Sequence, residues 1–384
     1  MMGAMRPVYL DHNATTPIAP EVVAAMMPYL GEEFGNPSSG HALGRRARAA
    51  IDEARSEVAR LIGAEPDEIV FTSGGTEANN LAIAGGMRAE ATRRHVVTST
   101  IEHPATVEPF KELARTGYAV TWVAVDGAAR VDAEGVAAIL TGDTALVSIM
   151  HSNNEVGTLQ PIAAIAKAAR ARGTLVHTDA AQSVGKVPID VRELGVDLLS
   201  IAGHKLYAPK GVGALYVRRG TPIAPVVRGA SHERGLRPGT ENVASIVGLG
   251  KACALSHDAI AGAERVRGLR DRLWDRLRAS VAGLALNGHA TERLPNTLSV
   301  RFPRARGTAL LARIEDEVFA STGSACHDGH ESPSSVLRAM GLDDEAALGT
   351  VRLSLGRATT EHDVDAAAGA LTRAWIALTD GNAR

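Results

Sequence analysis

Short β-rich runs alternate with longer helical patterns from about Asp67 onward, and this alternation limits the possible folds more than any other feature. Strands that alternate with helices of about 10–15 residues are typical of a mostly parallel sheet covered by helices. Apolar runs such as 69–71 suit central strands, which are buried on both faces. The predicted strands are 68–72, 95–99, 119–123, 145–150, 175–178, 197–201 and 214–217. The predicted helices between them include 77–88, 106–115, 133–140 and 162–172.

Beyond residue 239 the alternation gives way to a long helix-compatible stretch that reaches about Ser280. Two short strands are expected after it, at 284–286 and 297–302, and a final Ala-rich helix at 361–378. This change predicts two domains. The large domain comprises residues 13–255, and the smaller α/β domain comprises residues 256–384 with residues 1–12 packed on it.

Charge and hydrophobicity exclude some classes of protein. The formal net charge of −2 argues against a chain built to coat nucleic acid or to lie on anionic lipid. No stretch approaches the ~18 uninterrupted apolar residues of a membrane helix, and the N-terminus has no signal-peptide pattern. We therefore expect a cytoplasmic protein with no membrane contact and no direct nucleic-acid binding.

A glycine-containing turn, residues 72–77, follows a predicted strand and opens a predicted helix. Glycines allow backbone N–H groups to approach an anion, and the helix N-terminus adds partial positive charge. The turn is thus a candidate phosphate site. A plain strand-to-helix turn with a Thr cap is the alternative.

Three polar residues follow the ends of predicted strands, where open α/β sheets bind ligands: Lys205, Asp179 and His103. A lysine held in a low-dielectric site loses its proton easily and can form a Schiff base with an aldehyde cofactor. A carboxylate can keep a pyridine nitrogen protonated, and an imidazole can stack on a ring and move protons. Each residue also has a structural alternative: Lys205 could be a surface lysine, Asp179 a helix cap and His103 a structural histidine. Lys210 is the nearby competitor for the role of Lys205.

The two cysteines lie in different surroundings. Cys326 is in a small, polar, Gly-containing segment, so we expect an accessible thiol that His327 or His330 could activate. Cys253 is in an apolar helix and is expected to be inert. Cys-His-x-x-His also offers three possible metal ligands, but no fourth is evident, so we predict no metal site.

A segment near the C-terminus, residues 351–357, is predicted to be a strand that carries two arginines. Arginine binds carboxylates through two parallel hydrogen bonds, so Arg352 is a candidate for holding a substrate carboxylate. Solvated surface charges are the alternative for both arginines.

Taken in order, these motifs resemble the cysteine desulfurases of the class V branch of fold-type I pyridoxal-phosphate enzymes. The resemblance covers nearly the whole chain and rests on several ordered motifs. The matching stretches are 9–16, 34–39, 71–77, 153–157, 203–205, 239–242, 323–326 and 333–337.

The resemblance implies a fold and a set of roles. The fold is a large domain with a mostly parallel central sheet and a smaller α/β domain. Lys205 would hold pyridoxal phosphate as a Schiff base, with Asp179 facing the pyridine nitrogen and His103 stacked on the ring. The other implied cofactor contacts are Gly75, Thr76, Asn154, Gln182, His204 and, from the second subunit of a homodimer, Thr240. The implied contacts to the carboxylate of L-cysteine are Asn36, Asn154 and Arg352.

Cys326 would then attack the substrate sulfur, become a persulfide and release L-alanine. The persulfide would pass to a protein acceptor for iron–sulfur cluster assembly or another sulfur-containing product. Ala202, where many members have serine, together with Pro238 and the Cys326–His327 pair, leans toward selenocysteine lyases, the first alternative. A non-enzymatic thiol- or metal-binding protein is the second.

Overall fold

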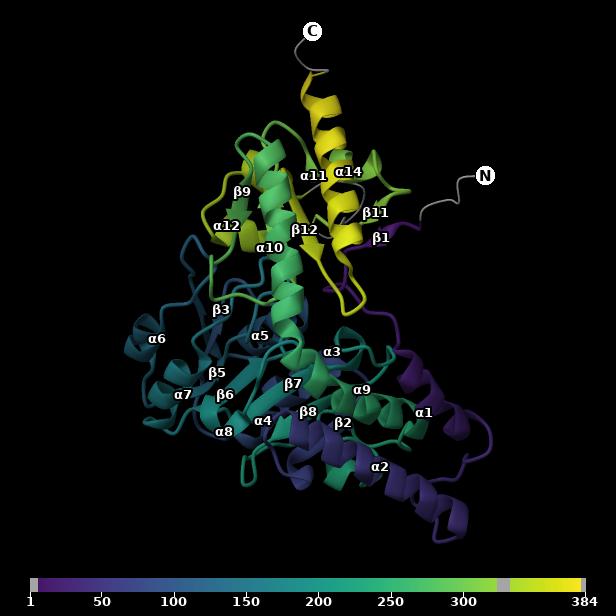
Figure 1. The fold of residues 1–384 in the computed structure, drawn as a ribbon. Helices are drawn as coiled ribbons and strands as arrows, with labels where there is room; N and C mark the ends of the chain where they lie inside the picture. Colours follow the sequence, from purple (N-terminus) through teal and green to yellow (C-terminus); the bar gives the residue numbers. More distant parts are fainter. Residues whose placement is uncertain (1–5, 323–331, 381–384) are drawn as a thin grey trace.

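The computed structural model describes residues 6–322 and 332–380, which form a larger and a smaller body (Figure 1). A seven-stranded sheet lies at the centre of the larger body. Its order is β2 (Ile69–Thr72), β8 (Gly213–Val217), β7 (Leu198–Ala202), β6 (Leu175–Asp179), β5 (Thr144–Ser148), β3 (His95–Ser99) and β4 (Ala119–Val123). Only β8 runs against the others within this sheet. The predicted fold class is confirmed.

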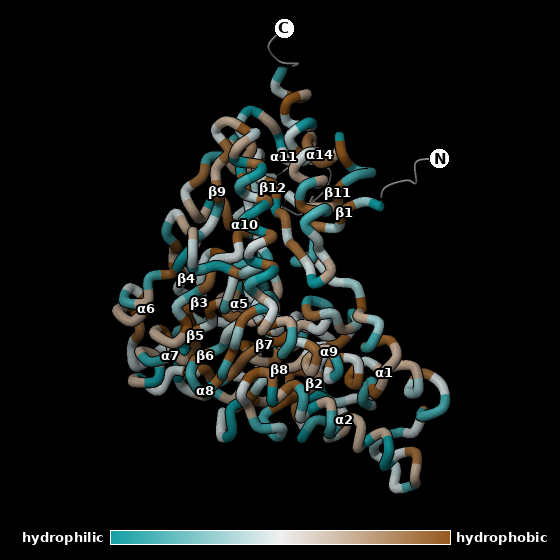
Figure 2. The backbone as a smooth tube through the Cα atoms, in the orientation of Figure 1, coloured by the Kyte–Doolittle hydropathy of each residue, from teal (hydrophilic) through white to brown (hydrophobic). Residues whose placement is uncertain are grey.

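The central strands are apolar on both faces because helices cover both faces of the sheet. Every residue of β5, β7 and β8 is buried, and the brown, hydrophobic stretches of chain gather at these strands in Figure 2. The helices that contact the strands of this sheet include α2 (Ala42–Leu61), α5 (Pro104–Arg115) and α7 (Ile162–Arg170). Outside them, α6 (Ala133–Ile139) and α8 (Val191–Leu194) pack on α7, and α1 (Pro20–Leu30) packs on α9 (Val243–Ala261).

The helix predicted at 77–88 is built from three consecutive pieces. They are α3 (Gly75–Asn80), a π-helical turn η2 (Leu81–Gly85) and α4 (Gly86–Ala89). The long stretch after residue 239 is two helices, α9 (Val243–Ala261) and α10 (Ala263–Ser280), which meet at Gly262. By length and composition α9 could cross a membrane, but half of its apolar window is buried and it packs against α1 and α2.

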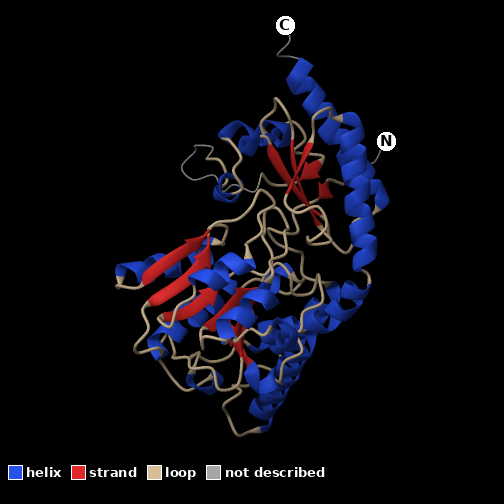
Figure 3. Ribbon diagram, turned by 90° about the vertical axis from the view of Figure 1, so that its left-hand side faces the viewer, coloured by secondary structure: helices blue, strands red, loops and turns tan. Residues whose placement is uncertain are grey.

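The smaller body contains an antiparallel sheet in the order β12 (Thr350–Ser354), β10 (Thr297–Arg301) and β9 (Ala285–Asn287). Its longest helices are α10 and α14 (Glu361–Asp380), which pack on each other, and the shorter ones are α11 (Gly307–Ala312), α12 (Ser335–Ala339) and α13 (Asp344–Leu348). Figure 3 shows this small sheet above the large one.

The N-terminal segment lies on the smaller body. Here β1 (Val8–Tyr9) pairs in parallel with β11 (Val318–Phe319), and Leu10 belongs to the apolar core beneath β10 and β12. The helix α9 runs across residue 255, the end of the predicted large domain. The exact division into domains stays a prediction.

Candidate active site

The shared direction of β2, β3, β5, β6 and β7 brings the residues after their carboxyl ends to one edge of the sheet. A cavity of about 380 Å³ lies there, between the large sheet and β12 of the smaller body. Its lining brings together most of the residues predicted for the site: Gly75, Thr76, His103, Asn154, Asp179, Gln182, His204, Lys205 and Arg352.

Lys205 closes a short 3₁₀ turn, η3 (Gly203–Lys205), directly after β7. Its Nζ donates hydrogen bonds to the backbone oxygens of Asn13 (2.5 Å) and Ala14 (2.7 Å). Burial, helped by the positive charge of Arg352, lowers the pKa of Lys205 to about 8. The competitor Lys210 is exposed and does not line the cavity. Lys205 is therefore the amine that is placed and tuned to react.

Asp179 is the last residue of β6 and is buried. Its Oδ2 accepts a hydrogen bond from Asn79 Nδ2 (2.6 Å), and its Oδ1 accepts one from the backbone N–H of Ala181 (2.9 Å). Asn79 lies on α3, so the helix that begins at the glycine turn also orients this carboxylate. The sequence analysis missed Asn79, because only the fold brings it within reach of a residue 100 positions away.

His103 is the N-cap of α5, and its Nδ1 accepts a hydrogen bond from the backbone N–H of Ala105 (3.1 Å). Burial lowers the pKa of His103, Lys205 lowers it further, and Asp179 opposes the shift. With Nδ1 accepting, the neutral ring carries its hydrogen on Nε2. A neutral imidazole at the cavity wall can stack on a ring and exchange a proton.

Arg352 reaches the cavity from β12 and lies under the loop after β5. Its Nη1 donates to the backbone oxygen of Asn154 (3.1 Å), and its Nη2 pairs with Asp11 Oδ1 (2.8 Å). Its Nε has no partner among the residues that the structure describes. A guanidinium at a cavity wall can bind a carboxylate.

The glycine turn supplies the other end of the cavity. Gly75 and Thr76 open α3, and a Cβ at Gly75 would come within 3.2 Å of the Ala202 Cβ. His204 Nδ1 lies 3.2 Å from Thr15 Oγ1, and burial lowers the pKa of His204 to about 4. Gly75, Thr76 and His204 line the same cavity, and the backbone N–H groups, hydroxyl and imidazole of this set suit a phosphate.

Two predicted residues do not line the cavity in the single chain. Asn36 and Thr240 are both exposed. Cys326, His327 and His330 lie outside the described residues, so their predicted roles are not tested. Cys253 is fully buried, and burial raises the pKa of its thiol to about 12, as expected for an inert cysteine. No cluster of His, Cys, Asp and Glu in residues 6–322 and 332–380 could hold a metal ion.

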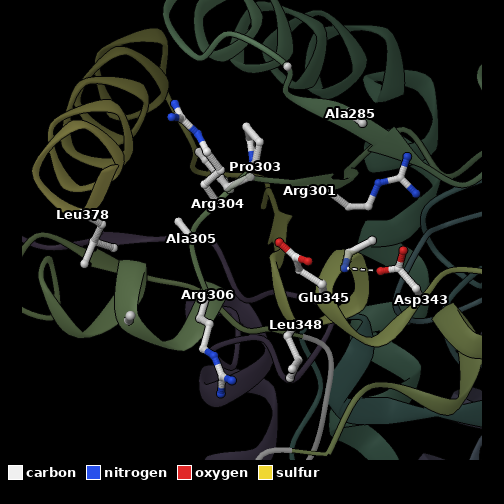
Figure 4. Close-up of a pocket in the computed structure, with 14 residues that line it drawn as sticks. Ala285, Arg301, Pro303, Arg304, Ala305, Arg306, Asp343, Glu345, Leu348 and Leu378 are labelled. Carbon is white, nitrogen blue, oxygen red and sulfur yellow. Dashed lines mark hydrogen bonds between the residues drawn. The ribbon is translucent and has the colours of Figure 1, made fainter. Parts of the chain in front are cut away.

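A larger groove, of about 1020 Å³, lies on the smaller body and is a different kind of surface. Figure 4 shows Arg301, Arg304 and Arg306 pointing in different directions, while Asp343 accepts a hydrogen bond from the backbone of α13. The groove therefore has no group of side chains aimed at one point, and the smaller cavity remains the candidate active site.

The family model described as Aminotransferase class-V matches residues 8–367. The chain belongs to the class-V aminotransferases. A cysteine desulfurase from Trichormus azollae is 48% identical over 364 residues, which cover 94% of this chain and 91% of that protein. The relatives place the chain among the cysteine desulfurases of this family, and they favour that activity over selenocysteine lyase or non-enzymatic thiol binding.

Solved structures agree with this membership. The structure of a NifS-like protein superposes with a TM-score of 0.89 at 37% identity and covers 98% of this chain and 100% of its own. The structure described as SspA in complex with cysteine superposes with a TM-score of 0.80 at 35% identity, covering 91% of this chain and 99% of its own.

The donor set of the cavity fits pyridoxal phosphate, the cofactor of this family. It offers an amine of lowered pKa, a carboxylate oriented by two hydrogen bonds, an imidazole and a glycine-lined anion site. A volume of about 380 Å³ is also in the range of about 300–1,000 Å³ that small-molecule sites occupy.

Proposed function

We propose that the enzyme binds pyridoxal 5'-phosphate in this cavity and transfers sulfur from L-cysteine to Cys326, with release of L-alanine. The single observation that supports this most strongly is that Lys205, Asp179 and His103, from three different strand ends, line one cavity. Bound pyridoxal phosphate supplies an aldehyde that condenses with amines and a ring that draws electrons from the substrate Cα.

Each of the main cavity residues then has a defined task. Lys205 Nζ would hold the aldehyde carbon, and its pKa of about 8 lets a useful fraction be unprotonated near neutral pH. The same amine would take the proton from the substrate Cα. Asp179 would keep a proton on the pyridine nitrogen, and His103 would pack on the ring face.

The substrate is oriented by its carboxylate. The Arg352 guanidinium is buried and lines the cavity, so its hydrogen bond to a carboxylate would be strong. Asn154 lies next to it, and Asn36 is the third proposed contact, to be supplied in the assembled enzyme.

In the sulfur step the Cys326 thiolate attacks the sulfur of the substrate. The new S–S bond forms as the C–S bond breaks, the electron pair of the C–S bond stays with the substrate, and protonation at Cβ gives L-alanine. Cys326 is left as a persulfide. We propose a protein acceptor for this sulfur, in iron–sulfur cluster assembly or another thiolation pathway.

We further propose a homodimer. An apolar strip on and after α1 is exposed in the single chain, with Val23 43%, Met27 58%, Leu30 65% and Phe34 75% exposed. The spacing of Val23, Met27 and Leu30 puts them on one face of α1, Phe34 follows the helix, and an exposed apolar strip of this kind is normally covered. The exposed Thr240 is then free to reach the phosphate of the second subunit.

The direct test measures L-alanine and sulfide released from L-cysteine by the purified enzyme. Cys326→Ala should abolish both products, because no thiolate remains to accept the sulfur, whereas Cys253→Ala should keep the wild-type rate. Release of both products by Cys326→Ala at the wild-type rate would refute the persulfide route. Faster turnover of L-selenocysteine than of L-cysteine would instead favour the alternative substrate.

A further inference from the structure

A second lysine, Lys186, lies behind the wall of the catalytic cavity and has no assigned task. Its Nζ donates to Gln182 Oε1 (2.9 Å) and to Asn13 Oδ1 (3.3 Å). Both acceptors line the catalytic cavity and are buried, Asn13 being 1% and Gln182 5% exposed. Lys186 itself lines a separate cavity of about 40 Å³ on the other side.

The surroundings of this amine favour its uncharged form. Burial lowers the pKa of Lys186 well below its usual value, and the positive charges of Lys205 and Arg352 lower it further. In residues 6–322 and 332–380 no carboxylate forms an ion pair with it. The nearby His12 ring is also uncharged at neutral pH, since burial lowers its pKa to about 4.

Two hydrogen bonds, one of them from Lys186, hold the Gln182 amide in its orientation. Gln182 Nε2 donates to the backbone oxygen of Asn13 (2.9 Å), which can only accept. The amide oxygen therefore faces Lys186, whose Nζ is its only hydrogen-bond partner among the described residues. The second N–H of Gln182 is then left for the cavity.

The same network reaches the reactive amine. The Asn13 backbone oxygen accepts from both Gln182 and Lys205, so the positions of these two side chains are coupled. The Asn13 side chain is held by a second donor, Asn296 Nδ2 (3.1 Å), and does not depend on Lys186 alone. Lys186 is thus the side chain that holds the Gln182 amide oxygen, while the Asn13 backbone oxygen holds its nitrogen.

We propose that Lys186 is a positioning residue that fixes the Gln182 amide so that its free N–H donates to the ring hydroxyl of the bound cofactor. This inference rests on the proposed function. A donor at that oxygen stabilises its negative charge and weakens its hold on the proton of the neighbouring Schiff-base nitrogen. Losing the donor should therefore raise the pH at which that proton leaves.

The test follows the absorbance of the holoenzyme's bound cofactor against pH, without substrate. Lys186→Met removes the donor and should raise the titration midpoint by about one pH unit. Gln182→Leu should give a similar rise, and the double variant should rise no further than Gln182→Leu alone. Lys210→Met, which changes an exposed lysine, is the matched control and should leave the midpoint unchanged.

The inference is overturned if Lys186→Met titrates at the wild-type midpoint, or if the shifts of the two single variants add up in the double variant. Either result overturns it even if the variant is less thermally stable. If Lys186→Met does not fold, Lys186→Gln is used instead, because glutamine keeps an N–H donor. Its shift of the midpoint should be smaller. When combined with Gln182→Leu, it should add nothing to the shift of Gln182→Leu alone. Wild-type enzyme without any absorbance band of a bound cofactor would overturn the proposed function as well, which separates the two failures.

Discussion

At the scale of single residues, the carboxyl group of Glu102 is buried near the site and is uncharged at neutral pH. Glu102 Oε1 accepts hydrogen bonds from Ser99 Oγ (2.5 Å) and the backbone N–H of Met150 (2.9 Å). Its Oε2 has no partner among the described residues. Burial raises the pKa of Glu102 to about 8, and the nearby Asp179 adds to the rise. Glu102 is thus a neutral acid at neutral pH.

This neutral acid predicts a pH dependence of stability. The pKa is about 8 in the folded chain and roughly 4.3 in the unfolded chain, so the folded state binds more protons in between. Protonated Glu102 therefore makes its full contribution to the free energy of unfolding below pH ~4.3. As the pH rises through 8 this contribution is lost, by up to about 1.4 kcal/mol per pH unit. In Glu102→Gln this loss should be absent.

The measurement is the free energy of unfolding by denaturant from pH 5 to pH 8. The wild-type curve should fall more steeply with pH than the Glu102→Gln curve. Glu155, whose pKa burial raises to about 7, contributes equally to both proteins and cancels in the comparison. Parallel curves would show that Glu102 is ionised in the folded enzyme.

At the scale of elements, the contact between α2 and α9 sets how closely two helices of the larger body approach. A Cβ at Gly250 would lie 2.5 Å from Ala54 Cα and 2.6 Å from Ala54 Cβ. Backbone cannot give way at such distances, so the glycine is required by the packing. By contrast, Gly268 in the middle of α10 has nothing within 4 Å of the position of a Cβ.

The two glycines predict opposite effects of the same substitution. Gly250→Ala should lower the free energy of unfolding by about 1–3 kcal/mol, because it overpacks the helix contact. Gly268→Ala should raise it by up to about 1 kcal/mol, because alanine favours the helix. Thermal unfolding of both variants measures this, and equal shifts of the same sign would contradict the packing described here.

Elements with a strong local pattern could be predicted from the sequence. The strands 95–99 and 119–123 are found where their β-branched runs place them. The break at Gly262 was not predicted, because the residues on both sides favour helix. Pairing of β1 with β11 was also missed, since strands of two residues carry no periodic pattern.

The candidate site was predictable only where a side chain directly follows a strand. Asp179 and Lys205 do so, and both line the cavity. Asn13 and Lys186, by contrast, lie 173 positions apart, and no local pattern shows that they are hydrogen-bonded. Such contacts depend on how the smaller body packs on the larger one, which the sequence does not state.

At the scale of the whole molecule, the active site depends on the proposed second subunit. Met27 and Phe34 are among the most exposed apolar side chains of the strip that we expect to be covered. Charged residues there would be buried without partners in a dimer. Met27→Glu with Phe34→Glu should therefore give a monomer that retains pyridoxal phosphate poorly, because Thr240 of the second subunit is lost.

Light scattering during gel filtration measures the mass of this double variant. Ile376→Glu is the matched control, since Ile376 is also exposed (44%) but lies on α14, away from the strip. It should keep the wild-type mass. A dimer in both variants would show that α1 does not form the interface.

The covalent attachment of the cofactor to Lys205 tests the whole account most directly. Active holoenzyme is reduced with borohydride and digested, and the peptides are analysed by mass spectrometry. We expect a phosphopyridoxyl group on Lys205 alone, because its amine lines the cavity with a pKa lowered to about 8. A group on Lys186 or Lys210 instead, or no modified lysine in fully active enzyme, would contradict it.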